Sequence, residues 1–97
     1  MDFGIPETII NVCATTGLTV DIHGLGPKSD PERNTADELV SSLALRADMD
    51  GLPMPEENEG LEYTSQTEFA HMCGHDGHVA TLLSTAKGLW SCRESIP

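Results

Sequence analysis

The clearest apolar pattern of the chain lies near its C-terminal end, where hydrophobic residues recur at helical spacing. Polar residues occupy the positions between them, as in a helix that packs one face against a core. Asp76 stands just before this run, where an N-cap residue accepts hydrogen bonds from the amides of the first turn. The pattern therefore predicts a core helix that follows Asp76. Its apolar members are Val79, Leu82, Leu83, Ala86 and Trp90.

Two shorter patterns lie at the N-terminal end. Pro6 at a first helical position, Glu7 in the first turn and Gly17 just past the end predict a short helix. Cys13 would lie on the packed face of this helix, so we interpret it as a small buried hydrophobic residue. Residues 18–22 then alternate apolar and polar side chains, which predicts a half-buried strand.

The middle of the chain combines a loop and a short apolar run. Residues 24–42 carry Gly-Pro and Asp-Pro pairs with mixed charges, which predict an exposed loop insertion. Residues 43–47 are mostly apolar and predict a buried strand, which ends at Asp48 and Asp50. Carboxylates at this end of a strand lie where open α/β sheets place their ligands, although Asp-x-Asp-Gly also often caps a turn. We favour Asp48 as a site residue.

The chemistry of the chain is concentrated in residues 71–78, which hold three histidines, one cysteine and one aspartate. Thiolate and neutral imidazole are ligands that Zn²⁺ and similar metals prefer. Gly74 lets the backbone bend, so that Cys73 and His75 could face one ion. These residues predict a metal-binding loop that leads into the C-terminal helix, with Asp76 chiefly capping that helix.

Composition narrows the class of protein. The 97 residues have a formal net charge of −11, which opposes binding to nucleic acid or to an anionic membrane surface and suits cations. Three cysteines without a framework spacing favour a reducing compartment. No signal peptide or membrane span is recognisable, so we expect a cytoplasmic protein. Glu56 and Glu57 lie in an acidic loop, where a solvated role is favoured over that of base or metal ligand.

Two stretches carry a resemblance to a known family. Residues 45–56 read LRADMDGLPMPE and residues 71–78 read HMCGHDGH. Together they resemble the two N-terminal motifs of the M20 metallopeptidase-like amidohydrolases, in the branch of hippurate hydrolase, N-acyl-amino-acid amidohydrolases and auxin-conjugate hydrolases. The resemblance extends over residues 43–90, is weaker over residues 6–22 and is absent over residues 24–42.

The resemblance implies an α/β fold: residues 1–97 would be the N-terminal part of a mixed-sheet, zinc-peptidase-like catalytic domain with flanking helices, without the lid domain. The family holds two divalent ions, which can be Zn, Mn, Co or Ni. The implied substrate is a small N-acyl amino acid, and the full-length enzyme could form a homodimer.

Individual positions take their expected roles from the same resemblance. Cys73 and His75 match metal ligands, and Asp48 matches a catalytic carboxylate that supports the site from the strand end. Arg46 stands where some distant relatives have a ligand histidine. Three further residues are expected to line the site, namely His71, Asp76 and His78.

The family's glutamate pair and its remaining histidine ligands follow the second motif, whereas here Glu94 is the only later acid and no histidine follows His78. We therefore expect an incomplete, inactive fragment of a metal-dependent amidohydrolase. An alternative is a small acidic metal-binding module without catalysis. A third reading, thiol catalysis by Cys73, is disfavoured because residues two apart on a loop rarely align as nucleophile and base.

Overall fold

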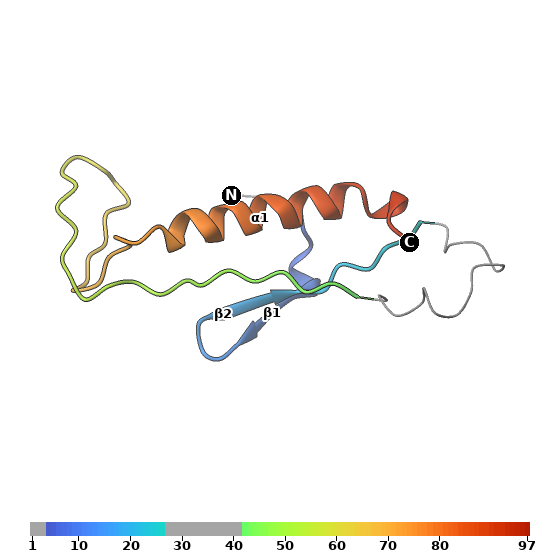
Figure 1. The fold of residues 1–97 in the computed structure, drawn as a ribbon, viewed down its shortest axis with the longest axis horizontal. Coiled ribbons are helices and arrows are strands. Elements are labelled where there is room, and N and C mark those ends of the chain that lie inside the picture. Colours follow the sequence, from blue (N-terminus) through green and yellow to red (C-terminus); the bar gives the residue numbers. More distant parts are fainter. Residues whose placement is uncertain (1–3, 27–41) are drawn as a thin grey trace. The chain divides into compact units, whose positions relative to one another are not determined.

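The computed structural model describes residues 4–26 and 42–97 (Figure 1). Most of the predicted loop over residues 24–42 lies outside these described residues. Contacts divide the chain into two compact units, Met1–Leu45 with Leu83–Pro97, and Arg46–Leu82. The elements in chain order are η1 (Glu7–Ile9), β1 (Ile10–Cys13), β2 (Gly17–Val20), α1 (His75–Ser91) and η3 (Arg93–Ser95).

A β-hairpin occupies the N-terminal region in place of the predicted helix. β1 pairs antiparallel with β2, with Ile10 opposite Val20 and Cys13 opposite Gly17. A Cβ on Gly17 would lie 2.9 Å from the Cys13 carbonyl oxygen, so glycine permits this tight pairing instead of ending a helix. The helix prediction was wrong because β1 is rich in β-branched residues that suit a strand.

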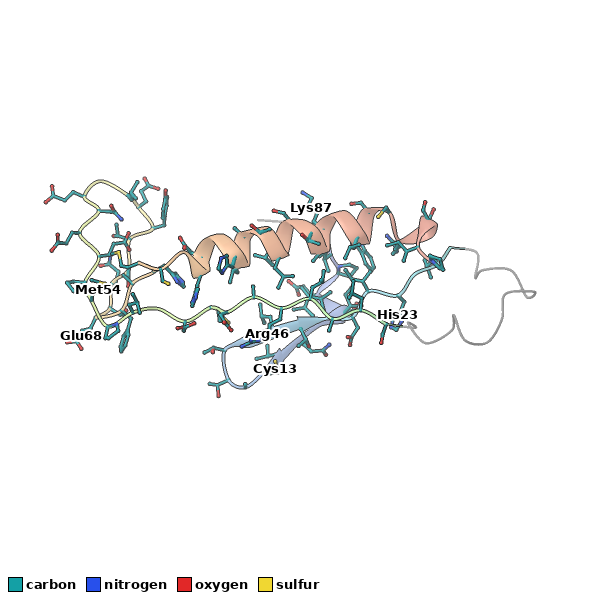
Figure 2. All side chains as sticks on the ribbon, viewed as in Figure 1. Cys13, His23, Arg46, Met54, Glu68 and Lys87 are labelled. Atoms are coloured by element: carbon teal, nitrogen blue, oxygen red, sulfur yellow. The ribbon has the colours of Figure 1, made fainter. Side chains whose placement is uncertain are left out.

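The strand predicted over residues 18–22 is confirmed over its first part, since β2 ends at Val20. Cys13, in contrast, is exposed on β1 (Figure 2), so its interpretation as a buried residue was wrong. The reason is that the hairpin turns this position toward solvent.

α1 confirms the predicted C-terminal helix, but it begins earlier than the sequence predicted. It begins at His75, so Asp76 lies in the first turn and the N-cap prediction was wrong. The carbonyl of Gly74 accepts the first hydrogen bond, from the His78 amide at 3.1 Å. Four of the five predicted apolar positions are half-buried, whereas Leu83 is exposed. No residue of α1 is fully buried, so a core helix in the full sense is not formed here.

The predicted strand over residues 43–47 was also wrong. These residues are not paired as a strand, and Leu43 is 80% exposed. A strand needs a neighbour to satisfy its backbone groups, and within the described residues no strand pairs with this segment. The backbone pairs first at Leu52, which forms an isolated antiparallel bridge with Ala70. Ala70 is 3% exposed and is the one buried apolar residue among the described positions.

The C-terminal residues are held by backbone hydrogen bonds within their own unit. The amides of Leu25 and Gly26 donate to the carbonyls of Arg93 and Ile96, each at 2.7 Å. The Arg93 guanidinium lies 3.9 Å from the ring centroid of Trp90, at the end of α1. A two-stranded sheet with one long helix is a small α/β arrangement. Among the described helices, none combines the length and the apolar character needed to cross a membrane.

Candidate metal centre

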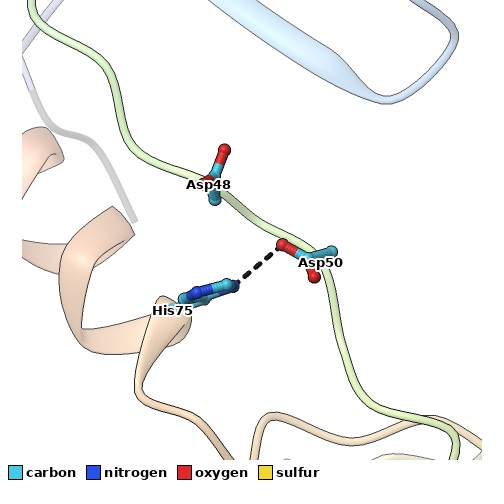
Figure 3. Close-up of side chains that lie close together, drawn as sticks. All are labelled: Asp48, Asp50 and His75. Carbon is cyan, nitrogen blue, oxygen red and sulfur yellow. Dashed lines mark hydrogen bonds and ion pairs between the residues drawn. The ribbon is translucent and has the colours of Figure 1, made fainter.

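Three side chains from the two predicted motifs come together within the unit Arg46–Leu82. Asp48 and Asp50 lie on the extended segment before Leu52, and His75 is the first residue of α1 (Figure 3). One ligand atom from each residue lies within 4.8 Å of the other two. The Leu52–Ala70 bridge brings the two segments together, because it pairs the chain just after Asp50 with the chain just before residues 71–78.

The closest contact of this group joins His75 Nδ1 and Asp50 Oδ1 at 2.8 Å, drawn as the dashed line in Figure 3. In the neutral tautomer with a proton on Nδ1, this nitrogen donates to the carboxylate and leaves the Nε2 lone pair available. The imidazole is 24% exposed and the Asp50 carboxylate 68% exposed. The ring of His78 lies 5.7 Å from that of His75, so a second imidazole borders the group.

Asp48 has a basic neighbour on its own segment. Arg46 Nη2 lies 2.5 Å from Asp48 Oδ1, and the two side chains are 84% and 46% exposed. An ion pair this exposed adds little stability because solvent screens it. The ion pair occupies one of the two oxygens of the Asp48 carboxylate.

The donor set of this group fits a divalent metal. Two carboxylates and one imidazole are hard and borderline ligands that suit Zn²⁺ or Mn²⁺. Ligand atoms bound to one such ion at about 2.0–2.2 Å lie within about 4.4 Å of each other. A spread of up to 4.8 Å is therefore close to what an ion needs, and small side-chain rotations would close it.

The other predicted site residues do not belong to this group among the described residues. Cys73 is an exposed free thiol, and its role as a ligand stays a prediction. His71 is exposed, and Asp76 is exposed in the first turn of α1.

Asp50 belongs to this group as well, although the sequence favoured only Asp48 as a site residue. Its signal was the i, i+2 spacing from Asp48, because alternate residues of an extended chain point to the same side.

Glu56 is half-buried and is bonded within its own loop, and the solvated role expected for it stays a prediction. Its carboxylate accepts hydrogen bonds from the Ser65 amide at 2.7 Å and from the Asn58 side chain at 2.9 Å. The Ser65 amide, followed by the Asn58 donor, holds the pKa of Glu56 below its ordinary value. These bonds favour the charged form of the carboxylate. The bond to Ser65 also joins two ends of the loop that lies between the two motifs.

Comparison with known proteins places the chain in a family. The profile of peptidase family M20/M25/M40 matches residues 44–97, which include Asp48, Asp50, Cys73 and His75. The chain belongs to this family. The resemblance inferred from the two M20 motifs is thus confirmed.

Several curated M20-type relatives share this region. An N-acyl-L-amino acid amidohydrolase of Geobacillus stearothermophilus is 51% identical over 55 residues, which are 56% of this chain and 15% of the relative. An IAA-amino acid hydrolase of Arabidopsis thaliana is 47% identical over 57 residues, or 56% of this chain and 12% of the relative. A hippurate hydrolase of Campylobacter jejuni is 52% identical over 50 residues, or 50% of this chain and 13% of the relative.

The matched regions thus span less than a sixth of the length of these M20 relatives. No solved structure matches the chain.

Proposed function

We propose that the chain contributes part of a divalent metal site for the hydrolysis of amide bonds in N-acyl amino acids or similar conjugates. The observation that carries the proposal is the grouping of Asp48, Asp50 and His75 within 4.8 Å, because all three belong to the region matched by the family. The relatives' names describe hydrolysis of N-acyl amino acids, IAA-amino acids and hippurate, and the substrate class is proposed on that basis.

Both the resemblance and the proximity of His75 to Asp48 and Asp50 support the proposal that His75 is a ligand. One nitrogen cannot donate a proton to Asp50 and bind a metal at the same time, so we assign Nε2 to the metal and Nδ1–H to Asp50. A carboxylate on the remote nitrogen fixes the tautomer and the orientation of the ring, and raises its basicity as a ligand. Asp50 would then hold His75, while Asp48 contributes its own carboxylate from the same side of the segment. Cys73 is proposed as an additional ligand from the resemblance alone.

A bound divalent ion would supply Lewis acidity, which lowers the pKa of a bound water and polarises the substrate carbonyl. The chain's own residues contribute binding and orientation. Asp48 and Asp50 place negative charge beside His75 and so attract the cation, and the Asp48–Arg46 pair limits the rotation of that carboxylate. No glutamate belongs to this group among the described residues, so we assign no general base in it.

Titration of the 97-residue chain with Co²⁺, followed by visible absorption, tests this proposal. We expect saturable binding that His75→Ala weakens at least ~10-fold, because even changes to residues that support a ligand cost about 10–100-fold. His23→Ala, which changes an exposed histidine outside this group, is the matched control and should retain most of the affinity. The absence of saturable binding by the unmutated chain would overturn the proposal.

The same titration tests whether Cys73 is a metal ligand. A thiolate ligand adds a sulfur-to-cobalt charge-transfer band, which Cys73→Ser should abolish and Cys92→Ser should preserve, since both thiols are exposed and free. A spectrum of the unmutated chain without this band would remove Cys73 from the ligand set.

The second candidate function is a metal-binding module without catalysis. The observation in its favour is the openness of the group, since Asp48 and Asp50 are both exposed. Water competes strongly for substrate and metal at such a site. Saturable metal binding without hydrolysis of any N-acyl amino acid by the 97-residue chain would favour this candidate.

A further inference from the structure

Glu56 belongs to a loop that borders one cavity together with the second motif. The residues on either side of it, Pro55, Glu57 and Asn58, line one cavity together with Met54 and Met72. Met72 lies in the segment of residues 71–78, so the two walls of the cavity come from the two motifs.

The backbone pair at the base of the loop sets the spacing between the motifs. The Leu52 amide donates to the Ala70 carbonyl at 2.9 Å, and the Ala70 amide donates to the Leu52 carbonyl at 3.0 Å. Asp50 lies two residues before this pair on one segment, and His71 directly follows it on the other. A long flexible loop between paired residues would oppose this pairing through its closure entropy.

The Glu56 carboxylate reduces that entropy by closing the loop internally. It binds the amide of Ser65, nine residues away in the chain, at 2.7 Å. The hydroxyl of Ser65 in turn donates to the Phe69 carbonyl at 2.5 Å, and the Thr67 hydroxyl donates to the same carbonyl at 3.1 Å. A continuous hydrogen-bonded path thus connects Glu56 to the residue before Ala70.

We propose that Glu56 is a positioning residue, whose carboxylate closes residues 56–65 and thereby holds the Leu52–Ala70 pair that places Asp50 beside His75. Glu57 and Glu59 are exposed and make none of these bonds, so the role belongs to the position and not to acidic charge in the loop. The consequence for metal binding rests on the proposed function, whereas the effect on the backbone pair does not.

Hydrogen exchange of the Leu52 and Ala70 amides, measured by NMR on the 97-residue chain, tests the backbone effect without metal. Since a charged acceptor strengthens the hydrogen bond from the Ser65 amide, we expect Glu56→Ala to accelerate both exchanges ~5-fold or more. Glu56→Gln, which keeps one acceptor oxygen for Ser65, should recover part of the protection. Glu59→Gln, with the same charge change in the same loop, should exchange like the unmutated chain.

Affinity for Mn²⁺ alone, measured by calorimetry on the same variants, tests the consequence for the site. We expect it to fall in the order unmutated chain, Glu56→Gln, Glu56→Ala, with Glu59→Gln unchanged. If the unmutated chain does not bind Mn²⁺, the proposed function fails and amide exchange alone decides the positioning role.

If both amides exchange in Glu56→Ala as slowly as in the unmutated chain, the proposal is overturned. If that variant loses the helical circular-dichroism signal of α1, Glu56→Gln takes its place. We expect both amides to exchange ~2-fold faster in Glu56→Gln than in the unmutated chain, because a neutral acceptor makes a weaker hydrogen bond. Equal rates in the two proteins overturn the proposal.

Discussion

The Asp50 carboxylate serves either to orient His75 or to bind the metal directly, and two substitutions separate these roles. Asn keeps an oxygen that accepts the Nδ1 proton of His75, whereas Ala keeps none. For the orienting role we expect Asp50→Asn to weaken metal binding only a few-fold, and Asp50→Ala to weaken it about 10–100-fold. Co²⁺ titration measures both. Equal, large losses in the two variants would instead assign Asp50 as a direct ligand.

The low pKa of Glu56 makes the closed loop sensitive to acid. A carboxyl whose pKa is depressed in the folded chain stabilises it above the ordinary value of 4.5, and loses this contribution as the pH falls through the lower folded pKa. The Ser65 and Asn58 bonds cause the shift, whereas desolvation and the charge of Asp76 oppose it and the charge of His71 adds to it. We therefore expect the Ser65 amide proton resonance to titrate with a midpoint below pH 4.5.

Glu56→Gln is the control for this titration, since it cannot ionise at the position that binds Ser65. The Ser65 resonance should then lose its low-pH transition. A transition that persists in this variant would assign the titration to another carboxyl.

At the scale of the element, α1 depends on an unusual backbone conformation at its start. Gly74 has a φ of +95°, which L-residues adopt only with strain, whereas a Cβ added at Gly77, in the first turns, would meet open space. We expect Gly74→Ala to destabilise the start of the helix by about 1–2 kcal/mol. Gly77→Ala should stabilise the helix by about 0.8–1 kcal/mol, because alanine is the better helix former.

Thermal unfolding followed at the helical circular-dichroism band compares these two glycine variants. The opposite signs of the two shifts are the essential result, since both replace glycine by alanine within four residues of each other. A stabilising Gly74→Ala would show that His75 does not need this backbone conformation.

The sequence pattern could predict elements that depend on local geometry but not those that depend on a pairing partner. The repeat of apolar residues in α1 reports local geometry, because i, i+3 and i+4 positions meet whatever surrounds the helix. β1 and the segment of residues 43–47 depend on a pairing partner that local pattern does not reveal. The hairpin replaced a predicted helix, and the predicted strand remained unpaired, for this one reason.

At the scale of the whole molecule, metal binding should appear as added stability. A ligand that binds only the folded chain stabilises it by RT ln(1 + [L]/Kd), which is about 2.7 kcal/mol at 100 times Kd. We expect Mn²⁺ or Zn²⁺ to raise the melting temperature of the 97-residue chain and a chelator to reverse the change. His75→Ala should lose the shift, and a shift that persists in that variant would place the metal elsewhere.

Catalysis by the isolated chain is a separate question, because its site includes no glutamate among the grouped ligands. We expect no measurable hydrolysis of hippurate by the metal-loaded 97-residue chain. Metal-dependent release of glycine would contradict this expectation and would require a base that the described residues do not bring to the group.

The sequence by itself determined the family, the C-terminal helix and the two motifs that carry Asp48 and His75. These features depend on residue identity and on spacing along a few turns of chain. Only the tertiary structure decided that Asp50 meets His75, that Glu56 closes the loop between the motifs and that the N-terminal residues form a hairpin. The physical reason is that each of these depends on a contact between separate segments, namely the Leu52–Ala70 pair, the Glu56–Ser65 bond and the pairing of β1 with β2, which the local pattern does not specify.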